Sequence, residues 1–237
     1  IWMSRTPSRR RTRSSRRSSK GVMKGGGLLR IPTKAQALAL LEEGGRKNPG
    51  PWVRHCRYAG KAAQAIAAKT KTLDPEAACI LGLLHDIGRR FGVTGSRHIY
   101  DGWAFAKEHG WDDLARVCLT HSFPLQDIEA CSGSWDVGGV DGSEKREKAA
   151  ALLKDVSYDD YDRLLQLCDA LALPDGFSLL EQRWVDVVLR YGTNPLLPQK
   201  WAATYALKRH FEALCGVKDL YCLLPGIVER TFPWAFA

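Results

Sequence analysis

Six residues with side chains that bind metal ions are spread through the middle of this chain. His85 and Asp86 stand side by side in the apolar run 81–90. Burying an imidazole next to a carboxylate costs free energy, and a bound metal ion is the simplest compensation. Further donors of the same kinds lie before and after the pair, at His55, His98, His121 and Asp169. Four of the six histidines of the chain therefore belong to one candidate metal-binding set.

Helical periodicity points at least one of these donors into the fold. From Met23 onward, apolar residues recur at the spacing of α-helices, and no convincing period-two strand pattern is present. The sequence therefore predicts an all-α fold. In a helix expected over 52–70, His55 shares one face with Ala59 and Ile66. We expect His55 to face inward, as a metal ligand does.

A second helix is expected to carry the His85–Asp86 pair. Asp74 is a good N-cap residue, and Pro75 suits the first helical position. Successive side chains of a helix diverge by about 100°, so one cation contacts both residues only over the edge between them. An earlier helix is expected over 33–43, ended by two consecutive glycines. Further helices are expected over 98–110, 158–173 and 198–215.

The length of 237 residues suits one large domain with a substantial core. We expect this single domain over 23–237, with its metal-site core at about 48–192, after a tail over 1–22. The Gly-rich stretch 122–148 is the loosest part of the domain and a candidate lid or substrate-specific insertion.

The positive charge of the chain is concentrated in the tail. Of the formal net charge of +9, eight units come from Lys and Arg in residues 1–22, which hold no acid, and about +1 is left for the rest. The Arg/Ser-rich tail has almost no apolar residues, so we expect it to be disordered. It is either a basic arm for nucleic acid or anionic lipid, a transit peptide, or an upstream extension before a start near Met23. We favour the extension, so nucleic acid is not an expected partner of the domain.

Cysteine usage and hydropathy indicate the environment of the protein. The seven cysteines are scattered and never spaced as Cys-x-x-Cys, which favours reduced thiols over disulfides or a zinc knuckle. No apolar run approaches the length that spans a bilayer. We therefore expect a soluble, cytoplasmic protein with no membrane partner.

Taken in order, the six donors resemble the signature of the HD-domain metal-dependent phosphohydrolases, over about residues 48–192. Segments 98–102 (His-x-x-x-Gly) and 120–122 (Thr-His-Ser) are similar to motifs of the bacterial branch that hydrolyses dinucleoside polyphosphates. The resemblance implies a compact helical bundle and a hydrolase acting on a nucleotide or small phosphate ester. Segment 122–124 (Ser-Phe-Pro) departs from that branch, so the substrate stays open.

The same resemblance implies a ligand set for one or two divalent transition metal ions. Fe or Mn suits this mixture of imidazole and carboxylate best, with Zn, Co or Ni as alternatives. The first ion would be held by His55, His85, Asp86 and Asp169. The second would be held by Asp86, His98 and His121, which makes Asp86 a catalytic bridging ligand. Such ions activate water and neutralise charge on phosphoryl oxygens.

Four arginines are candidates for binding substrate phosphate. Arg89 stands where many relatives have Lys, so it keeps the positive charge and adds a bidentate fork. We expect it to be the nearest phosphate clamp and a catalytic residue. Weaker candidates are Arg90, Arg97 and Arg183.

Two other functions remain compatible with the ligand set. Some HD-fold enzymes use the same six ligands as di-iron oxygenases, which need iron and consume O₂. A binding or sensor module would keep the metal site without turnover. A hydrolase, in contrast, works without O₂ and with Mn.

Overall fold

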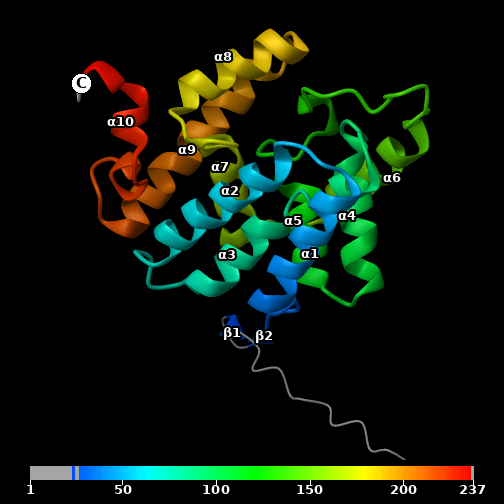
Figure 1. Ribbon diagram of the computed structural model, residues 1–237, viewed down its shortest axis with the longest axis horizontal. Coiled ribbons are helices and arrows are strands. Elements are labelled where there is room, and N and C mark those ends of the chain that lie inside the picture. The colour runs from blue at the N-terminus through cyan, green and yellow to red at the C-terminus, as the bar shows by residue number, and fades with distance from the viewer. Residues whose placement is uncertain (1–22, 25–26, 236–237) are drawn as a thin grey trace, which may run out of the picture.

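Helices dominate the part of the chain that the structure describes, which confirms the all-α prediction. The computed structural model describes residues 23–24 and 27–235, and the predicted disordered tail over 1–22 lies outside them. Figure 1 shows the helices packed around α2, α3 and α7. The α-helices are α1 (Lys34–Lys47), α2 (Trp52–Ala67), α3 (Pro75–Leu84), α4 (Arg97–Glu108), α5 (Asp112–Thr120), α6 (Ser143–Asp155), α7 (Asp160–Leu171), α8 (Leu180–Tyr191), α9 (Leu197–Cys215) and α10 (Ile227–Thr231). Short 3-10 helices are η1 (Ile87–Phe91), η2 (Ile128–Ala130), η3 (Leu220–Leu223) and η4 (Pro233–Ala235).

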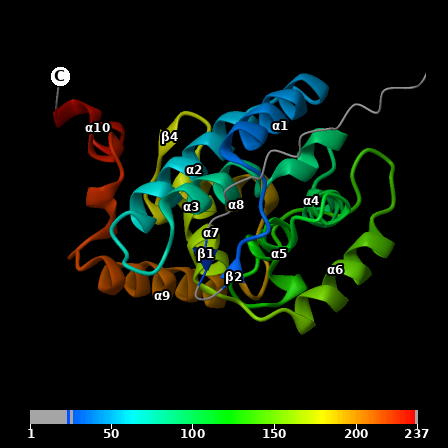
Figure 2. The same ribbon diagram turned by 90° about the horizontal axis from the view of Figure 1, so that it is seen from below.

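Helix α3 forms the centre of the core. Asp74 caps it by accepting a hydrogen bond from the Ala77 N–H at 2.7 Å, and Pro75 begins it, as predicted. Every residue from Ala77 to Leu84 is buried. Helices α2 and α3 run side by side in both views (Figures 1 and 2). Their backbones come so close that a Cβ on Gly82 would lie 2.6 Å from the Cα of Gly60, so only glycine fits there.

Helix α7 joins the core to the C-terminal part of the chain. It contacts α2, α3 and α5 on one side and α8 and α9 on the other. An Asp159 capping box begins this helix: the Asp159 carboxylate accepts from N–H groups of the first turn, and Asp162 accepts from the Asp159 N–H. Helix α7 therefore links the central helices α2 and α3 to the C-terminal helices α8 and α9.

The prediction that two glycines end the first helix is wrong. Helix α1 continues through Gly44 and Gly45 to Lys47. Gly44 is buried, and a Cβ there would lie 2.9 Å from the indole ring of Trp52. The glycine therefore makes room for a large side chain from α2 and does not terminate the helix.

Two small hairpins accompany the helices. Strands β1 (Met23–Lys24) and β2 (Gly27–Leu28) pair antiparallel, and so do β3 (Ala172–Leu173) and β4 (Gly176–Phe177). Strands of two residues show no alternating pattern, so the sequence did not predict them. The second hairpin directly follows α7 and takes the place of the last residues of the helix predicted over 158–173.

The seven cysteines are all unpaired, as predicted. Among the described helices, none is both long and apolar enough to cross a membrane.

Candidate metal centre

The four histidines of the predicted set share one pattern of hydrogen bonding. Each places its Nδ1 against a backbone carbonyl, which has no hydrogen to give, so Nδ1 must carry the proton. In the neutral ring, Nε2 then keeps its lone pair and is free to bind a metal ion. The pairs are His55 with Ala172 at 3.2 Å, His85 with Gly82 at 2.8 Å, His98 with Gly95 at 2.5 Å and His121 with Cys118 at 2.9 Å.

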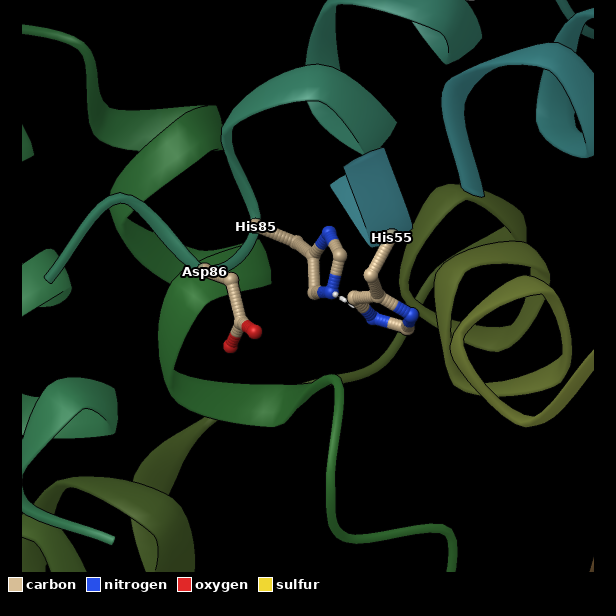
Figure 3. Close-up of side chains that lie close together, drawn as sticks. All are labelled: His55, His85 and Asp86. Carbon is tan, nitrogen blue, oxygen red and sulfur yellow. Dashed lines mark hydrogen bonds between the residues drawn. The ribbon is translucent and has the colours of Figure 1, made fainter. Parts of the chain in front are cut away.

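His55, His85 and Asp169 converge where α2, the end of α3 and α7 meet. The Nε2 atoms of His55 and His85 are 3.2 Å apart, a contact drawn as a dashed line in Figure 3. The Oδ1 atom of Asp169 lies 2.9 Å from His55 Nε2 and 3.5 Å from His85 Nε2. Asp86 stands beside the two rings (Figure 3). Its carboxylate and the two imidazoles have ligand atoms within 4.8 Å of one another.

The other donors gather on the far side of Asp86. Its Oδ1 atom lies 2.9 Å from His98 Nε2 and 3.5 Å from His121 Nε2. These three residues form a second group with ligand atoms within 4.8 Å of one another. Asp86 is thus common to both groups. All three residues are buried, with residue exposures of 5% or less.

The His85–Asp86 pair does not lie inside a helix, contrary to the prediction. Helix α3 ends at Leu84, His85 is its C-cap, and Asp86 precedes η1 with φ −103° and ψ 16°. The chain leaves the helix here because Gly88 packs against the backbone of α4, where a Cβ would lie 2.0 Å from the carbonyl oxygen of His98. This departure turns His85 toward His55 and Asp86 toward His98.

The pKa values show that this cluster favours positive charge between its carboxylates. Burial alone would raise the pKa of Asp86, yet Arg89, His98 and His85 hold it well below its usual range. Burial likewise opposes ionisation of Asp169, but the adjacent imidazoles of His55 and His85 keep its pKa well below the usual range. Both carboxylates are therefore ionised at neutral pH.

Two of the histidines differ in their protonation. Burial lowers the pKa of His121 to about 3, with a further contribution from the neighbouring His85. His121 is thus neutral at any physiological pH, as metal ligation requires. Burial also opposes protonation of His85, but Asp86 and Asp169 outweigh it and raise the pKa of this imidazole.

The donor set fits a divalent transition metal ion. Four Nε2 lone pairs and two ionised carboxylates face one another, and acceptors that converge without enough hydrogen-bond donors are stabilised by a cation. The mixture of imidazole and carboxylate suits Fe, Mn, Zn and Co. The backbone carbonyls behind the rings hold each imidazole in the required tautomer. The structure therefore supports the prediction that these residues could hold divalent metal.

Arg89 contacts the cluster directly. Its Nε donates to Asp86 Oδ2 at 2.5 Å, and its Nη2 donates to His98 Nε2 at 3.4 Å. The side chain keeps 34% of its surface exposed, so it is not sealed from solvent. Arg89 therefore lies at the cluster, and its role in binding phosphate stays a prediction.

The structure does not bring Arg90 and Arg97 to the cluster. The Arg90 guanidinium packs 4.5 Å from the ring centroid of Phe105 and pairs with Glu43 at 2.9 Å. Arg97 donates to the backbone carbonyl of Val140 at 2.7 Å and ties the loop before α6 to α4. Both side chains are buried, so we assign them a structural role and not a role in binding substrate.

Arg183 lies in a pocket that also contains candidate metal ligands. The pocket is bounded by α7, α8 and α9, and His121 and Asp169 contribute to its lining. Lys200 lines it too, and sequence reasoning missed this residue. A single Lys on an amphipathic helix resembles any surface Lys, so no local signal distinguishes it.

Sequence reasoning also missed the polar network behind His121. The Thr120 hydroxyl donates to Asp162 Oδ1 at 2.8 Å, and Arg116 pairs with Asp162 Oδ2 at 2.9 Å. Gln166 donates to the Thr120 carbonyl oxygen at 3.1 Å. Asp162 is fully buried. Its hydrogen bond and ion pair to α5 fix the end of that helix and the position of His121. No local sequence pattern predicts these contacts.

Comparison with known proteins agrees with this geometry. The family model described as HD domain matches residues 52–173, just over half of the 237 residues. All six candidate ligands lie within the match, whereas α8 and α9 lie beyond it. No curated protein and no solved structure gives a significant match.

Proposed function

The chain belongs to the HD domain family, and from this premise we propose that it is a metal-dependent phosphohydrolase acting on a nucleotide or small phosphate ester. The observation that carries the proposal is the convergence of four Nε2 atoms on two carboxylates, with every Nδ1 held by a backbone carbonyl. Such a preorganised, buried set binds metal with little rearrangement.

We assign His55, His85, Asp86 and Asp169 to a first metal ion, and Asp86, His98 and His121 to a second. When bound, such ions supply Lewis acidity and activate water near neutral pH. The protein residues keep the His121 imidazole neutral, hold both carboxylates ionised and limit bulk water around the reacting groups. Asp86 is central because it is common to both groups.

Arg89 supplies positive charge at the edge of this centre. The Asp86 carboxylate accepts a hydrogen bond from the Nε–H of Arg89, and this bond orients the guanidinium before substrate binds. We expect its other N–H groups to donate to phosphoryl oxygens as charge develops on them. This arrangement favours phosphoryl transfer to water over a reaction on an uncharged substrate.

The experiment that tests the proposal is a metal analysis of the purified protein combined with a phosphate-release screen. The screen covers mononucleotides, cyclic dinucleotides and dinucleoside polyphosphates, with Mn or Fe added after chelation. We expect phosphate release that disappears with the metal and returns with Mn under anaerobic conditions. Activity that requires iron and consumes O₂ would establish the oxygenase instead, and metal binding without any turnover would establish a sensor.

Replacing Arg89 with methionine is expected to lower kcat by about 100-fold, because an oriented charge at the transition state is lost. Metal content should stay at the wild-type level, since Arg89 is not a ligand. Lysine at the same position should retain more activity than methionine, because it keeps the positive charge. It should remain below the wild type, because it cannot donate two parallel hydrogen bonds to one phosphate. The measurement is steady-state kinetics on the best substrate of the screen, together with metal analysis.

Arg57 provides a matched control on α2. It forms an exposed pair with Glu42 at 3.4 Å and has no contact with the cluster. Arg57→Met should keep wild-type kcat. Equal kcat in Arg89→Met and the wild type would refute the role of Arg89.

A further inference from the structure

A pocket between α7, α8 and α9 opens beside the candidate metal centre. His121 and Asp169 reach it from the cluster, whereas Arg183, Trp184, Lys200 and Trp201 reach it from α8 and α9. These two helices lie outside the residues that match the HD domain. The pocket is therefore built partly by elements that this chain adds to the family core.

Lys200 brings an ammonium group into the pocket without a matching anion. Its Nζ donates to the carbonyl oxygen of Ala130 at 3.0 Å and forms no ion pair with any carboxylate of the described residues. Burial lowers the pKa of Lys200, while the charge of Asp169 acts in the opposite direction. An ammonium group that is partly withdrawn from water and lacks an ionic partner favours an anionic ligand.

Arg183 adds a second cation to the same pocket. Its Nη1 lies 3.2 Å from Asp186 Oδ2, and 19% of its side chain is exposed. Asp186 is shared, because Arg190 donates to both of its oxygens, at 3.1 Å and 2.5 Å. Because Asp186 is shared with Arg190, it neutralises the charge of Arg183 only in part.

Two stacked indoles contribute to the lining of the pocket. The indoles of Trp184 and Trp201 stack with centroids 5.1 Å apart and an interplanar angle of 13°. Tyr205 packs edge-on against Trp184 at 4.8 Å. These rings exclude water from one side, and ionic interactions strengthen where less water screens them.

We propose that Lys200 and Arg183 form a second anion site, which binds an anionic group of the substrate remote from the phosphoryl group that reacts at the metal centre. The site selects substrates that carry two or more linked anionic groups over simple phosphate monoesters. This inference rests on the proposed function for the reaction itself, but the anion site is measurable without turnover.

The test is calorimetric titration of the full-length protein, as purified with its metal, using three probes of increasing length. They are inorganic phosphate and the non-hydrolysable methylene analogues of pyrophosphate and tripolyphosphate. We expect an affinity gain of at least about 10-fold at one step of the series, since charge-assisted hydrogen bonds contribute on this scale. Lys200→Met should abolish the gain and leave phosphate affinity unchanged, and Arg183→Met should reduce it.

Two further variants separate charge from structure. Arg209→Met removes an exposed cation from α9 outside the pocket and should keep the full gain. Lys200→Arg keeps a positive charge and should retain most of the affinity gain that Lys200→Met loses. A purely structural role for Lys200 would not predict this recovery. A gain that persists in Lys200→Met, or equal affinities for all three probes in the wild type, would overturn the proposal.

The titration also separates this inference from the proposed function. A length-dependent gain that needs Lys200, in a protein that releases no phosphate from any substrate, supports the anion site and refutes the hydrolase. Phosphate release without the gain supports the hydrolase and refutes the anion site.

Discussion

Asp86→Asn is expected to abolish metal binding and to lower phosphate release by at least about 1000-fold, the largest loss of activity from any single substitution in this chain. Asp86 is the one residue common to both donor groups, and its Oδ1 lies 2.9 Å from His98 Nε2. An amide has similar shape but no negative charge, so it cannot balance the charge of a cation in a buried site. Metal analysis and kinetics on the purified variant measure both effects.

A matched control is available on α4. Asp101 is also largely buried and pairs with Lys145 at 2.6 Å, away from the cluster. Asp101→Asn should keep the wild-type metal content and kcat, although it loses one ion pair. A normal metal content in Asp86→Asn would show that the ligand set is assigned wrongly. Full activity in that variant would refute the phosphohydrolase mechanism.

Gly88→Ala is expected to destabilise the protein by about 3 kcal/mol and to remove the metal at the same time. A Cβ on Gly88 would lie 2.0 Å from the carbonyl oxygen of His98 and 2.5 Å from the Gly102 nitrogen. Both are backbone atoms, so the strain cannot be relieved by rotating a side chain. Helix α4 must move away from η1, which separates His98 from Asp86. Urea unfolding and metal analysis follow the two consequences.

Gly102→Ala tests the same contact from the other side. Its Cβ would meet the Cys118 side chain at 3.2 Å and the Gly88 nitrogen at 3.3 Å, which is tight but less than a clash. We expect a smaller loss of stability and retained metal. If Gly88→Ala unfolds at the wild-type urea concentration and keeps its metal, the close approach of η1 and α4 is not what positions the ligands.

Much of the fold follows from local sequence pattern. Helical periodicity and the cap at Asp74 predicted most helices, because these signals depend on neighbouring residues. The errors arose where packing overrides local preference. Helix α1 continues through Gly44 because that glycine contacts Trp52, and α3 ends before Asp86 because Gly88 packs on α4.

In the candidate site, too, some features follow from the sequence and others from packing. Histidine and aspartate can be recognised as donors wherever they occur, so all six candidate ligands were found without coordinates. Whether an arginine faces the site depends on partners far along the chain. Arg90 turns to Phe105 and Glu43, and Arg97 to the loop before α6, although both are close in sequence to ligands.

Residue types and helical spacing by themselves determined that this protein is all-α and carries donors for divalent metal. Only the tertiary structure decided how those donors act, because lone-pair direction depends on which backbone carbonyl holds each Nδ1. Tertiary structure also placed Lys200 and Asp169 in the lining of one pocket, since no local pattern relates helices α7 and α9. The chemistry of each side chain is known from the sequence, whereas the convergence of charged side chains arises only when distant segments pack together.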